Sequence, residues 1–592
     1  MLASFISHSK FQALLHLHST NLHCPHQIHF KFLATATYNT VACNAKIISL
    51  SRAGNIEAAR KLFDEMPNKD VVSWNSIITA YWQNGFLQES KTLFRSMPST
   101  NVVSWNSIIS GCIEHDNADD AYEYFTSMPE RNTASYNSMI SGFVRSGRIQ
   151  EASRLFEIMP KRNVISYTAM IDGYMQFGDV ERARLLFDSM PCRNVVSWTV
   201  MIRGYVESGR FEEASELFRK MPEKSVVATT AMITGFCKEG RMEEARVLFD
   251  KLRNRDCVSF NALISGYAQN GRSEEALKVH IQMLQTGLQP DHATFISVLT
   301  ACSNLASLSE GTQTHTLVLK HGFNSHVSIC NALVTMYSKC GCIFDSVSAF
   351  GHVRSPNIVS WNTIIAAFAQ HGLYEQALAY FKQMQLNGFD PDGITFLSML
   401  SACGHAGLIN ESMNWFDLME RNYKVTPTSE HYACLVHTLG RAGQLEKAHS
   451  LIQRMPSKAD SGVWGALLAG CRANLNVELG QIAADKIMEL EPNNSGAYVM
   501  LSNIYAARGM WREVTSVRGL MKQHGVKKQP AYSWMDVGNE VHSFVGGDIS
   551  HPDIEDIHTQ LKQINWRMKD MNGMHLFLPQ SCIDETELFS CM

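Results

Sequence analysis

The hydrophobic residues of this chain recur with a helical period that is interrupted at regular points. In residues 195–207 the apolar positions lie three or four residues apart, at Trp198, Met201, Ile202 and Tyr205. Gly209 then interrupts the pattern. In residues 211–221 the apolar residues Phe211, Ala214, Leu217 and Phe218 share one face of the expected helix, and the charged residues lie elsewhere. Because this is the spacing of amphipathic helices, the segment predicts two helices joined by a turn.

The same helix pair repeats along most of the chain. The phrase VVSWNSII at residues 71–78 returns at residues 102–109, and degraded copies begin at residues 40, 133, 164, 195 and 226, always in steps of 31 residues. Later units of other lengths cover residues 257–291, 292–326, 327–357, 358–392, 393–428 and 429–460. Thirteen tandem units therefore fill residues 40–460. A period of this size predicts an all-α solenoid, in which each hairpin is stable only by packing on its neighbours.

Composition narrows the function classes. The chain has 592 residues and a formal net charge of −4, so it is not a uniformly basic nucleic-acid binder, and a polyanion would have to meet locally arranged charge. No apolar run approaches the roughly 18 residues of a membrane span, so we expect no membrane association. The first acidic residue is Glu57. This acid-poor start predicts an organelle transit peptide over residues 1–39, and a frayed terminus is the alternative.

Two polar places recur in ten of the units. The fifth residue is always Asn or Thr, and it is Asn44, Asn75, Asn106, Asn137, Thr168, Thr199, Thr230, Asn261, Asn331 and Asn362. The last residue of the same units is Asp, Asn or Ser, and it is Asp70, Asn101, Asn132, Asn163, Asn194, Ser225, Asp256, Asp291, Asn357 and Asp392. These side chains offer hydrogen-bond donors and acceptors to a ligand.

A second interpretation of both places is structural. Asn or Thr would satisfy free amides at the start of the first helix, and Asp, Asn or Ser would cap the next one. That interpretation predicts Ser and Asp at the fifth place as well, and neither occurs there. Basic residues also recur at the thirteenth place, where they would either attract a phosphate backbone or lie on a solvated face; they are Arg52, Arg145, Lys238, Lys339 and Arg441.

The helix pairs, the 31- and 35-residue units, the Met-Pro endings such as Met190-Pro191 and the paired polar places resemble the pentatricopeptide repeat family of plant organelles, in its mixed long-and-short subclass. The resemblance covers residues 40 to about 572. It implies a right-handed superhelix that binds single-stranded RNA, with one base per repeat selected by the fifth and last residues. Residues 461–528 resemble the E region and residues 529–572 the E-plus extension, whereas residues 573–592 stay unassigned.

The resemblance also implies a target read 5′ to 3′. Asn44/Asp70, Asn261/Asp291 and Asn362/Asp392 would select U, and Thr230/Asp256 would select G. A pyrimidine, with C favoured in the first three, is implied for Asn75/Asn101, Asn106/Asn132, Asn137/Asn163 and Asn331/Asn357. An A is implied for Thr168/Asn194 and Thr199/Ser225. Three units fit no pairing, and they carry Ile296/His326, Leu397/Thr428 and Ala433/Asp460.

The chemistry of a deaminase is missing from the sequence. A zinc cytidine deaminase needs a His-x-Glu and a Cys-x-x-Cys ligand set, and neither motif occurs. Cys340 and Cys342 flank a glycine and are expected in a turn or core. The group His431, Cys434 and His437 is expected to be ordinary helix surface, with a zinc site as the alternative. We therefore predict a non-catalytic protein with no cofactor and no metal.

The leading hypothesis is a site-recognition factor for C-to-U RNA editing in a mitochondrion, or alternatively a chloroplast. The repeats would bind single-stranded organellar RNA. The E and E-plus region would recruit a deaminase-bearing protein of the same family, together with other editing cofactors. The alternatives are an organellar factor for transcript stabilisation, splicing or translation and, less favoured, a protein-binding helical scaffold.

Overall fold

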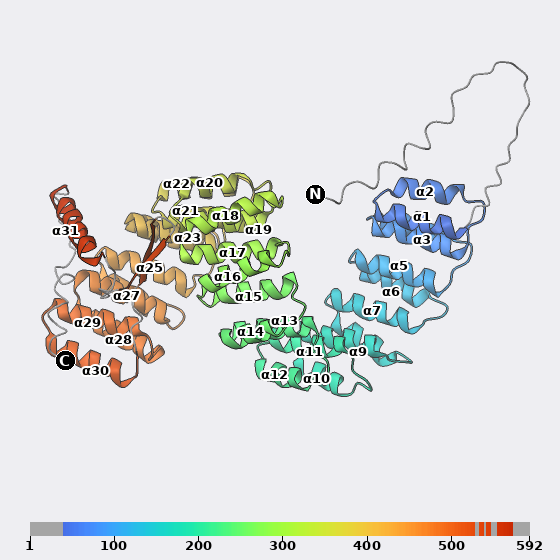
Figure 1. Ribbon diagram of the computed structural model, residues 1–592, viewed down its shortest axis with the longest axis horizontal. Coiled ribbons are helices and arrows are strands. Elements are labelled where there is room, and N and C mark those ends of the chain that lie inside the picture. The colour runs from blue at the N-terminus through green and yellow to red at the C-terminus, as the bar shows by residue number, and fades with distance from the viewer. Residues whose placement is uncertain (1–39, 527–531, 538–539, 546–552, 572–592) are drawn as a thin grey trace, which may run out of the picture. The chain divides into compact units, whose positions relative to one another are not determined.

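The protein is described here by a computed structural model, which covers residues 40–526, 532–537, 540–545 and 553–571. The predicted transit peptide and the unassigned tail lie outside these residues. The described chain forms two compact units, which divide within residues 271–288. In both units the sequence folds as alternating first and second helices, as the repeat pattern predicts (Figure 1).

The first unit contains seven complete repeats and the first helix of the next. Its helices are α1 (Thr40–Arg52), α2 (Ile56–Glu65), α3 (Val71–Gln83), α4 (Leu87–Arg95), α5 (Val102–Glu114), α6 (Ala118–Ser127), α7 (Thr133–Arg145), α8 (Ile149–Ile158), α9 (Val164–Gln176), α10 (Val180–Asp188), α11 (Val195–Glu207), α12 (Phe211–Lys220), α13 (Val226–Lys238), α14 (Met242–Asp250) and α15 (Cys257–Gln269). Helix α16 (Ser273–Gln285) carries residues of both units.

The second unit continues the alternation and ends differently. Its helices are α17 (His292–Leu305), α18 (Leu308–Lys320), α19 (Val327–Lys339), α20 (Ile343–Gly351), α21 (Ile358–Gln370), α22 (Tyr374–Leu386), α23 (Gly393–Ala406), α24 (Ile409–Arg421), α25 (Ser429–Arg441), α26 (Leu445–Gln453), α27 (Ser461–Asn474), α28 (Val477–Leu490), α29 (Ser495–Ala507), α30 (Trp511–Gln523) and α31 (Ile554–Met571). Before α31, β1 (Tyr532–Val537) and β2 (Glu540–Val545) pair antiparallel, with Tyr532 opposite Val545.

The expected helical solenoid is therefore confirmed, and the β1–β2 hairpin is an addition that the sequence did not predict. Within the described residues, none of the helices combines the length and apolarity needed to cross a bilayer.

Each repeat closes around a small residue, and most repeats add an aromatic contact to the next one. The small residue at the twentieth place is fully buried in each short repeat; these residues are Ala59, Ser90, Ala121, Ala152, Ala183, Ala214 and Ala245. A phenylalanine of the second helix then meets an aromatic residue of the next first helix, as in Phe187 and Trp198, whose ring centroids lie 5.1 Å apart in an edge-to-face arrangement. Each repeat thus buries its apolar face on its neighbour.

Successive first helices pack directly on one another, as α9 does on α11. Glycine at the tenth place permits this approach. A Cβ on Gly204 would lie 2.5 Å from a side-chain carbon of Met175, in the preceding first helix. The turn between first and second helix uses a left-handed residue, which is usually glycine, and Asp116 takes the same conformation with φ 54°. Within each unit the first helices thus form a row.

Candidate functional site

The last residue of each of the ten repeats caps the first helix of the following repeat. Each side-chain oxygen accepts a hydrogen bond from a backbone N–H three residues later, as Asp70 does from Ser73 at 2.7 Å and Asn163 from Ser166 at 3.0 Å. The same holds for the others, in α5, α7, α11, α13, α15, α17, α21 and α23. The capping interpretation is thus confirmed for the last place.

A hydroxyl at the third place of the next repeat completes this cap, and sequence reasoning missed it. Ser104, Ser135, Ser166, Ser197 and Ser259 are fully buried, and each forms a capping box with the preceding last residue. The pKa of Asp70 lies below its usual value, chiefly because the Ser73 hydroxyl and backbone N–H donate to the carboxylate. The serine stood in the repeated phrase, but its role depends on the side-chain geometry.

The fifth residues do not cap the helix. Instead, five of them form a hydrogen bond to the last residue of their own repeat, 26 or 30 positions away. The distances are 3.4 Å for Asn44 to Asp70, 3.5 Å for Asn106 to Asn132, 3.4 Å for Asn137 to Asn163, 3.2 Å for Thr199 to Ser225 and 2.9 Å for Asn362 to Asp392. The capping interpretation is wrong for the fifth place, and the two predicted positions come together.

At Asp392 and Asn163 the cap leaves one polar group of the last side chain unused. In Asp392 the bonds from Asn362 and Thr395 all end on Oδ1, so Oδ2 remains an available acceptor within the described structure. In Asn163 the Oδ1 accepts from Ser166 and Asn137, which fixes the amide orientation because an NH2 group cannot accept. Its Nδ2 remains an available donor. Asp and Asn therefore cap alike and differ in what they present outward.

The fifth residues also differ in what they present. Several asparagines bury Oδ1 without a partner among the described residues; these are Asn44, Asn75, Asn106, Asn137 and Asn331. Thr168 and Thr199 each donate their hydroxyl hydrogen at 2.7 Å to the carbonyl four residues earlier, which leaves an acceptor. Thr230 Oγ1 is buried without a partner in the described chain.

Some predicted pairs are not joined by a hydrogen bond in the described structure. They are Asn75/Asn101, Thr168/Asn194, Thr230/Asp256 and Asn331/Asn357, although each last residue still caps its helix. Asn261 and Asp291 belong to different units.

In the repeats that fit no base pairing, a last residue can have another role. Thr428, for example, caps α25 with His431, whose Nε2 bonds the Gly393 carbonyl at 2.8 Å.

Two further sequence alternatives receive a structural answer. The two ring nitrogens of His431 bond Thr428 and the Gly393 carbonyl, so this imidazole does not form a ligand group with Cys434 and His437. Across the residues that the structure covers, no three His, Cys, Asp or Glu side chains are arranged to hold a metal ion. At the thirteenth place, Arg145 pairs with Glu114 at 3.0 Å, so this guanidinium already has an acidic partner.

An exposed apolar residue at the second place is another feature that the sequence reasoning missed. Residues Val41, Val72, Val103, Ile165, Val196, Val227, Val258, Val359 and Ile394 are 55–74% exposed. In each first helix the second place lies three residues before the fifth and therefore on the same face. A helical period assigns such residues to the core, yet the structure places them beside the polar pairs.

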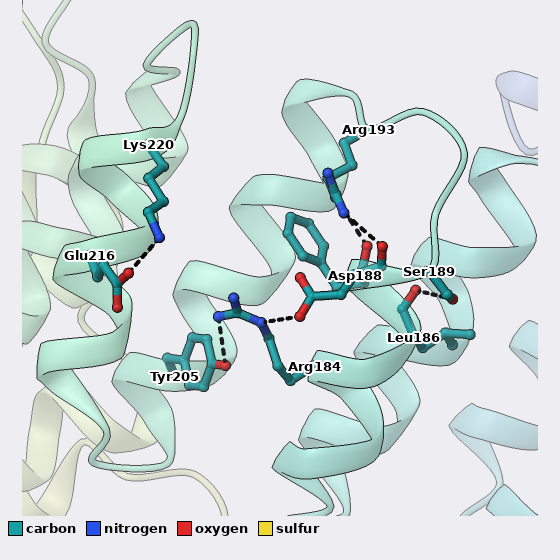
Figure 2. A network of polar contacts seen from close by, with 9 residues as sticks. Arg184, Leu186, Asp188, Ser189, Arg193, Tyr205, Glu216 and Lys220 are labelled. Carbon is teal, nitrogen blue, oxygen red and sulfur yellow. Dashed lines mark hydrogen bonds and ion pairs between the residues drawn. The ribbon is translucent and has the colours of Figure 1, made fainter.

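An arginine immediately before the last residue holds the loop that positions it. Arg193 donates from Nε to the Phe187 carbonyl at 3.0 Å and from Nη2 to the Asp188 carbonyl at 2.9 Å (Figure 2). Its guanidinium also lies 4.8 Å from the Phe187 ring centroid. The same clamp occurs at Arg131, Arg162 and Arg255. These arginines satisfy the end of the second helix rather than face a ligand.

We expect Arg193→Met to lower the free energy of unfolding by about 0.5–1 kcal/mol, because it removes two charge-assisted bonds and the ring contact at an exposed site. Denaturant titration followed by circular dichroism measures the change. Lys161→Met, in the corresponding loop of the preceding repeat, is the control, since Lys161 is exposed. An equal loss in both variants would contradict a clamp at Arg193.

The fold and the polar pairs define a class of protein, an α-solenoid with two adjoining polar side chains per repeat. Family models agree. The PPR repeat model matches residues 41–71, 72–102, 103–133, 165–195, 196–226, 227–257, 394–423 and 430–458, and the PPR repeat family model matches residues 131–165, 255–304 and 356–405. The chain belongs to the pentatricopeptide repeat family, and an E motif model matches residues 474–536.

Relatives from Arabidopsis thaliana carry the same family name. The chain is 41% identical over 289 residues to a mitochondrial pentatricopeptide repeat-containing protein, covering 49% of this chain and 48% of that one. It is 39% identical over 299 residues to the chloroplastic protein DOT4, covering 50% and 34%. The chain thus spans less than half the length of these relatives. The solved structure of maize PPR10 with an 18-nucleotide psaJ RNA element is 19% identical, with a TM-score of 0.47 and coverage of 83% and 80%.

Proposed function

We propose that this chain binds single-stranded RNA in a sequence-specific manner and marks sites for C-to-U editing in an organelle. The observation that carries the proposal is the hydrogen bond between the fifth and last residues in five of the repeats. Each such pair offers a small set of unused donors and acceptors, and the exposed second-place residue lies on the same face of the helix. A row of this kind is suited to reading successive unpaired bases, one per repeat.

The unused atom of the last residue supplies a physical reason for base selection. Asp leaves a carboxylate acceptor, which fits the N3–H of U or the N1–H of G. Asn leaves an NH2 donor, which fits the unprotonated N3 of C or N1 of A. On this basis Asp70 and Asp392 favour U, whereas Asn132 and Asn163 favour C. The ten pairs, at about 1 kcal/mol each, would together select one site among many.

The exposed second-place residues support the same proposal. Bases have flat apolar faces, and Val72 or Val103 would gain by covering them, because each such side chain otherwise stays in water. The two kinds of contact would have different roles. The aliphatic side chain would pack on the face of a base, and the polar pair would form hydrogen bonds with its edge.

The editing role is supported by the E motif at residues 474–536, which follows the repeats. The chain carries neither deaminase motif in its sequence, so the proposal assigns the chemistry to a second, deaminase-bearing protein bound through residues 461–572. We propose the mitochondrion as the site of action, and the chloroplast as the alternative. Transcript stabilisation, splicing or translation is the alternative role, separated by the experiment below.

A plant lacking this chain is expected to lose C-to-U conversion at one or a few organellar sites whose upstream bases match the predicted pairings. Sequencing organellar transcripts measures this. Restoring the full chain should restore editing, and a chain without residues 529–571 should bind the same RNA without restoring editing. Intact editing together with lost transcript abundance or splicing would contradict the editing role and favour the alternative.

A further inference from the structure

A hollow of about 320 Å³ opens between α23, α25 and α27 of the second unit. We call it the α25 hollow. Small residues create it, since Ala433, Gly462 and Ala466 line it from α25 and α27, and Gly404 from α23. Its volume falls at the lower end of the range of about 300–1,000 Å³ in which small-molecule sites lie.

The packing of α25 on α27 explains why a space remains. The two helices touch through their backbones near their C-terminal ends, where a Cβ on Gly470 would lie 2.7 Å from the Gly440 Cα. Closer to the N-terminal ends the small residues Ala433, Gly462 and Ala466 line the gap beside Cys434 and His437. The small residues are too short to fill it.

The hollow lies in line with the polar pairs. Ala433 holds the fifth place of the repeat at residues 429–460, where ten other repeats carry Asn or Thr. Gly462 holds the second place of the next helix pair, where nine of the repeats carry an exposed valine or isoleucine. The row of base contacts is therefore replaced by a cavity at this point, although the row of first helices continues through α25 and α27.

The lining chemistry fits a heteroaromatic ring. His405, His437 and Ser401 are among the lining residues and bring two imidazole rings and a hydroxyl. Burial lowers the pKa of His437, helped by nearby Arg441, so its ring is neutral at pH 7 and has one donor and one acceptor. Burial raises the pKa of the Cys434 thiol to about 11, which keeps it uncharged. The lining of this described region includes no carboxylate that would repel a polyanion.

We propose that the α25 hollow receives one unstacked nucleobase of the bound RNA strand, of either purine or pyrimidine type. This inference rests on the proposed RNA binding. With one nucleotide per repeat, the base concerned is the second one on the 3′ side of that assigned to Asn362 and Asp392; we call it the hollow nucleotide. The base stacks on an imidazole, and the repeat therefore contributes affinity without Asn or Thr at its fifth place.

The test uses the full chain and two RNAs that share the predicted target but differ at the hollow nucleotide, which is intact in one and abasic in the other. We expect the abasic RNA to bind about tenfold more weakly, as for loss of one stacked base. Ala433→Leu should fill the hollow. We call the ratio of the two affinities, intact over abasic, the abasic penalty. The Ala433→Leu variant should bind the intact RNA more weakly by a similar factor. It should also lose most of the abasic penalty, because the base no longer enters the hollow.

Two further variants keep the test decisive. His437→Ala removes a stacking surface without filling the hollow, and it should reduce the abasic penalty even if Ala433→Leu disturbs folding, which circular dichroism would show. Asn44→Ala, at the other end of the repeats, should weaken binding but leave the abasic penalty unchanged.

An abasic penalty that persists in both hollow variants would overturn the proposal. So would an unchanged affinity of Ala433→Leu, which would indicate another occupant such as a protein side chain. If binding depends on U opposite Asn362 and Asp392 but shows no abasic penalty, the proposal for the α25 hollow is wrong and the proposed RNA binding stands. A chain that binds neither RNA would overturn the proposed function as well.

Discussion

Exchanging Asp392 for Asn is expected to change the preferred nucleotide of its repeat from U to C. In the present structure Asp392 accepts from Thr395 at 2.9 Å and from Asn362 at 2.9 Å, both through Oδ1. An asparagine at this place would keep both bonds and replace the unused acceptor by an NH2 donor. We expect a loss of about tenfold for U and a comparable gain for C, since one good base contact is worth about 1–3 kcal/mol.

Competition binding with RNAs that differ only at this nucleotide measures the change. The melting temperature should stay nearly constant, because Asn and Asp cap helices about equally well. Asp179→Asn is the matched control. Asp179 caps the second helix α10 through the Arg182 N–H at 3.2 Å, in the layer that does not carry the polar pairs. A shift from U to C in the control, or none in Asp392→Asn, would contradict the assignment.

The repeat architecture could be predicted from the sequence because it depends on local periodicity. Apolar spacing placed both helices of each repeat, and the restricted residue types singled out the fifth and last places. The sequence left open whether these places cap helices or face a ligand. In the structure the last residue caps the next helix, and the fifth residue does not cap its own. Asn137 contacts Asn163 rather than the start of its helix, while Asn163 caps the next one. Their meeting depends on how neighbouring repeats stack.

Other features could not be predicted from one repeat considered alone. The hydrogen bonds of Arg193 depend on where the last carbonyls of α10 point. The α25 hollow depends on the small residues that α23, α25 and α27 carry where they face one another. The helical period assigns the valine at the second place to the core, whereas the structure exposes it. The period shows only which residues are apolar, and burial depends on whether another element packs there. The hairpin of β1 and β2 follows the repeats and has no repeated signal to reveal it.

In the proposed function, the last residue of a repeat both caps a helix and recognises a base, so a change in base preference need not lower stability. Asp, Asn and Ser at the last place all supply the oxygen that the next helix needs, as Asp70, Asn101 and Ser225 do. Asp and Asn differ in the second polar group, which forms no hydrogen bond within the described structure at Asp392 or Asn163, whereas Ser has no second polar group. The base preference of one repeat can therefore change while the hydrogen bonds that hold the stack stay in place.

The stack itself is expected to be least tolerant where two backbones meet. Gly470→Ala should lower the free energy of unfolding by about 3 kcal/mol, at the upper end for overpacking, because its new Cβ would lie 2.7 Å from the Gly440 Cα and a backbone cannot rotate aside. Denaturant titration of the full chain, followed by circular dichroism, measures the loss. RNA affinity should fall as well, since α25 and α27 extend the row of first helices.

Gly465→Ala is the matched control in the same helix. A Cβ at Gly465 would have no heavy atom within 4 Å, so the substitution should stabilise α27 by about 0.5–1 kcal/mol through helix propensity alone. The two substitutions are chemically identical and lie five residues apart, yet opposite signs are expected. Equal effects of the two would show that α25 and α27 do not meet at Gly440 and Gly470, and the space attributed to their packing would then need another cause.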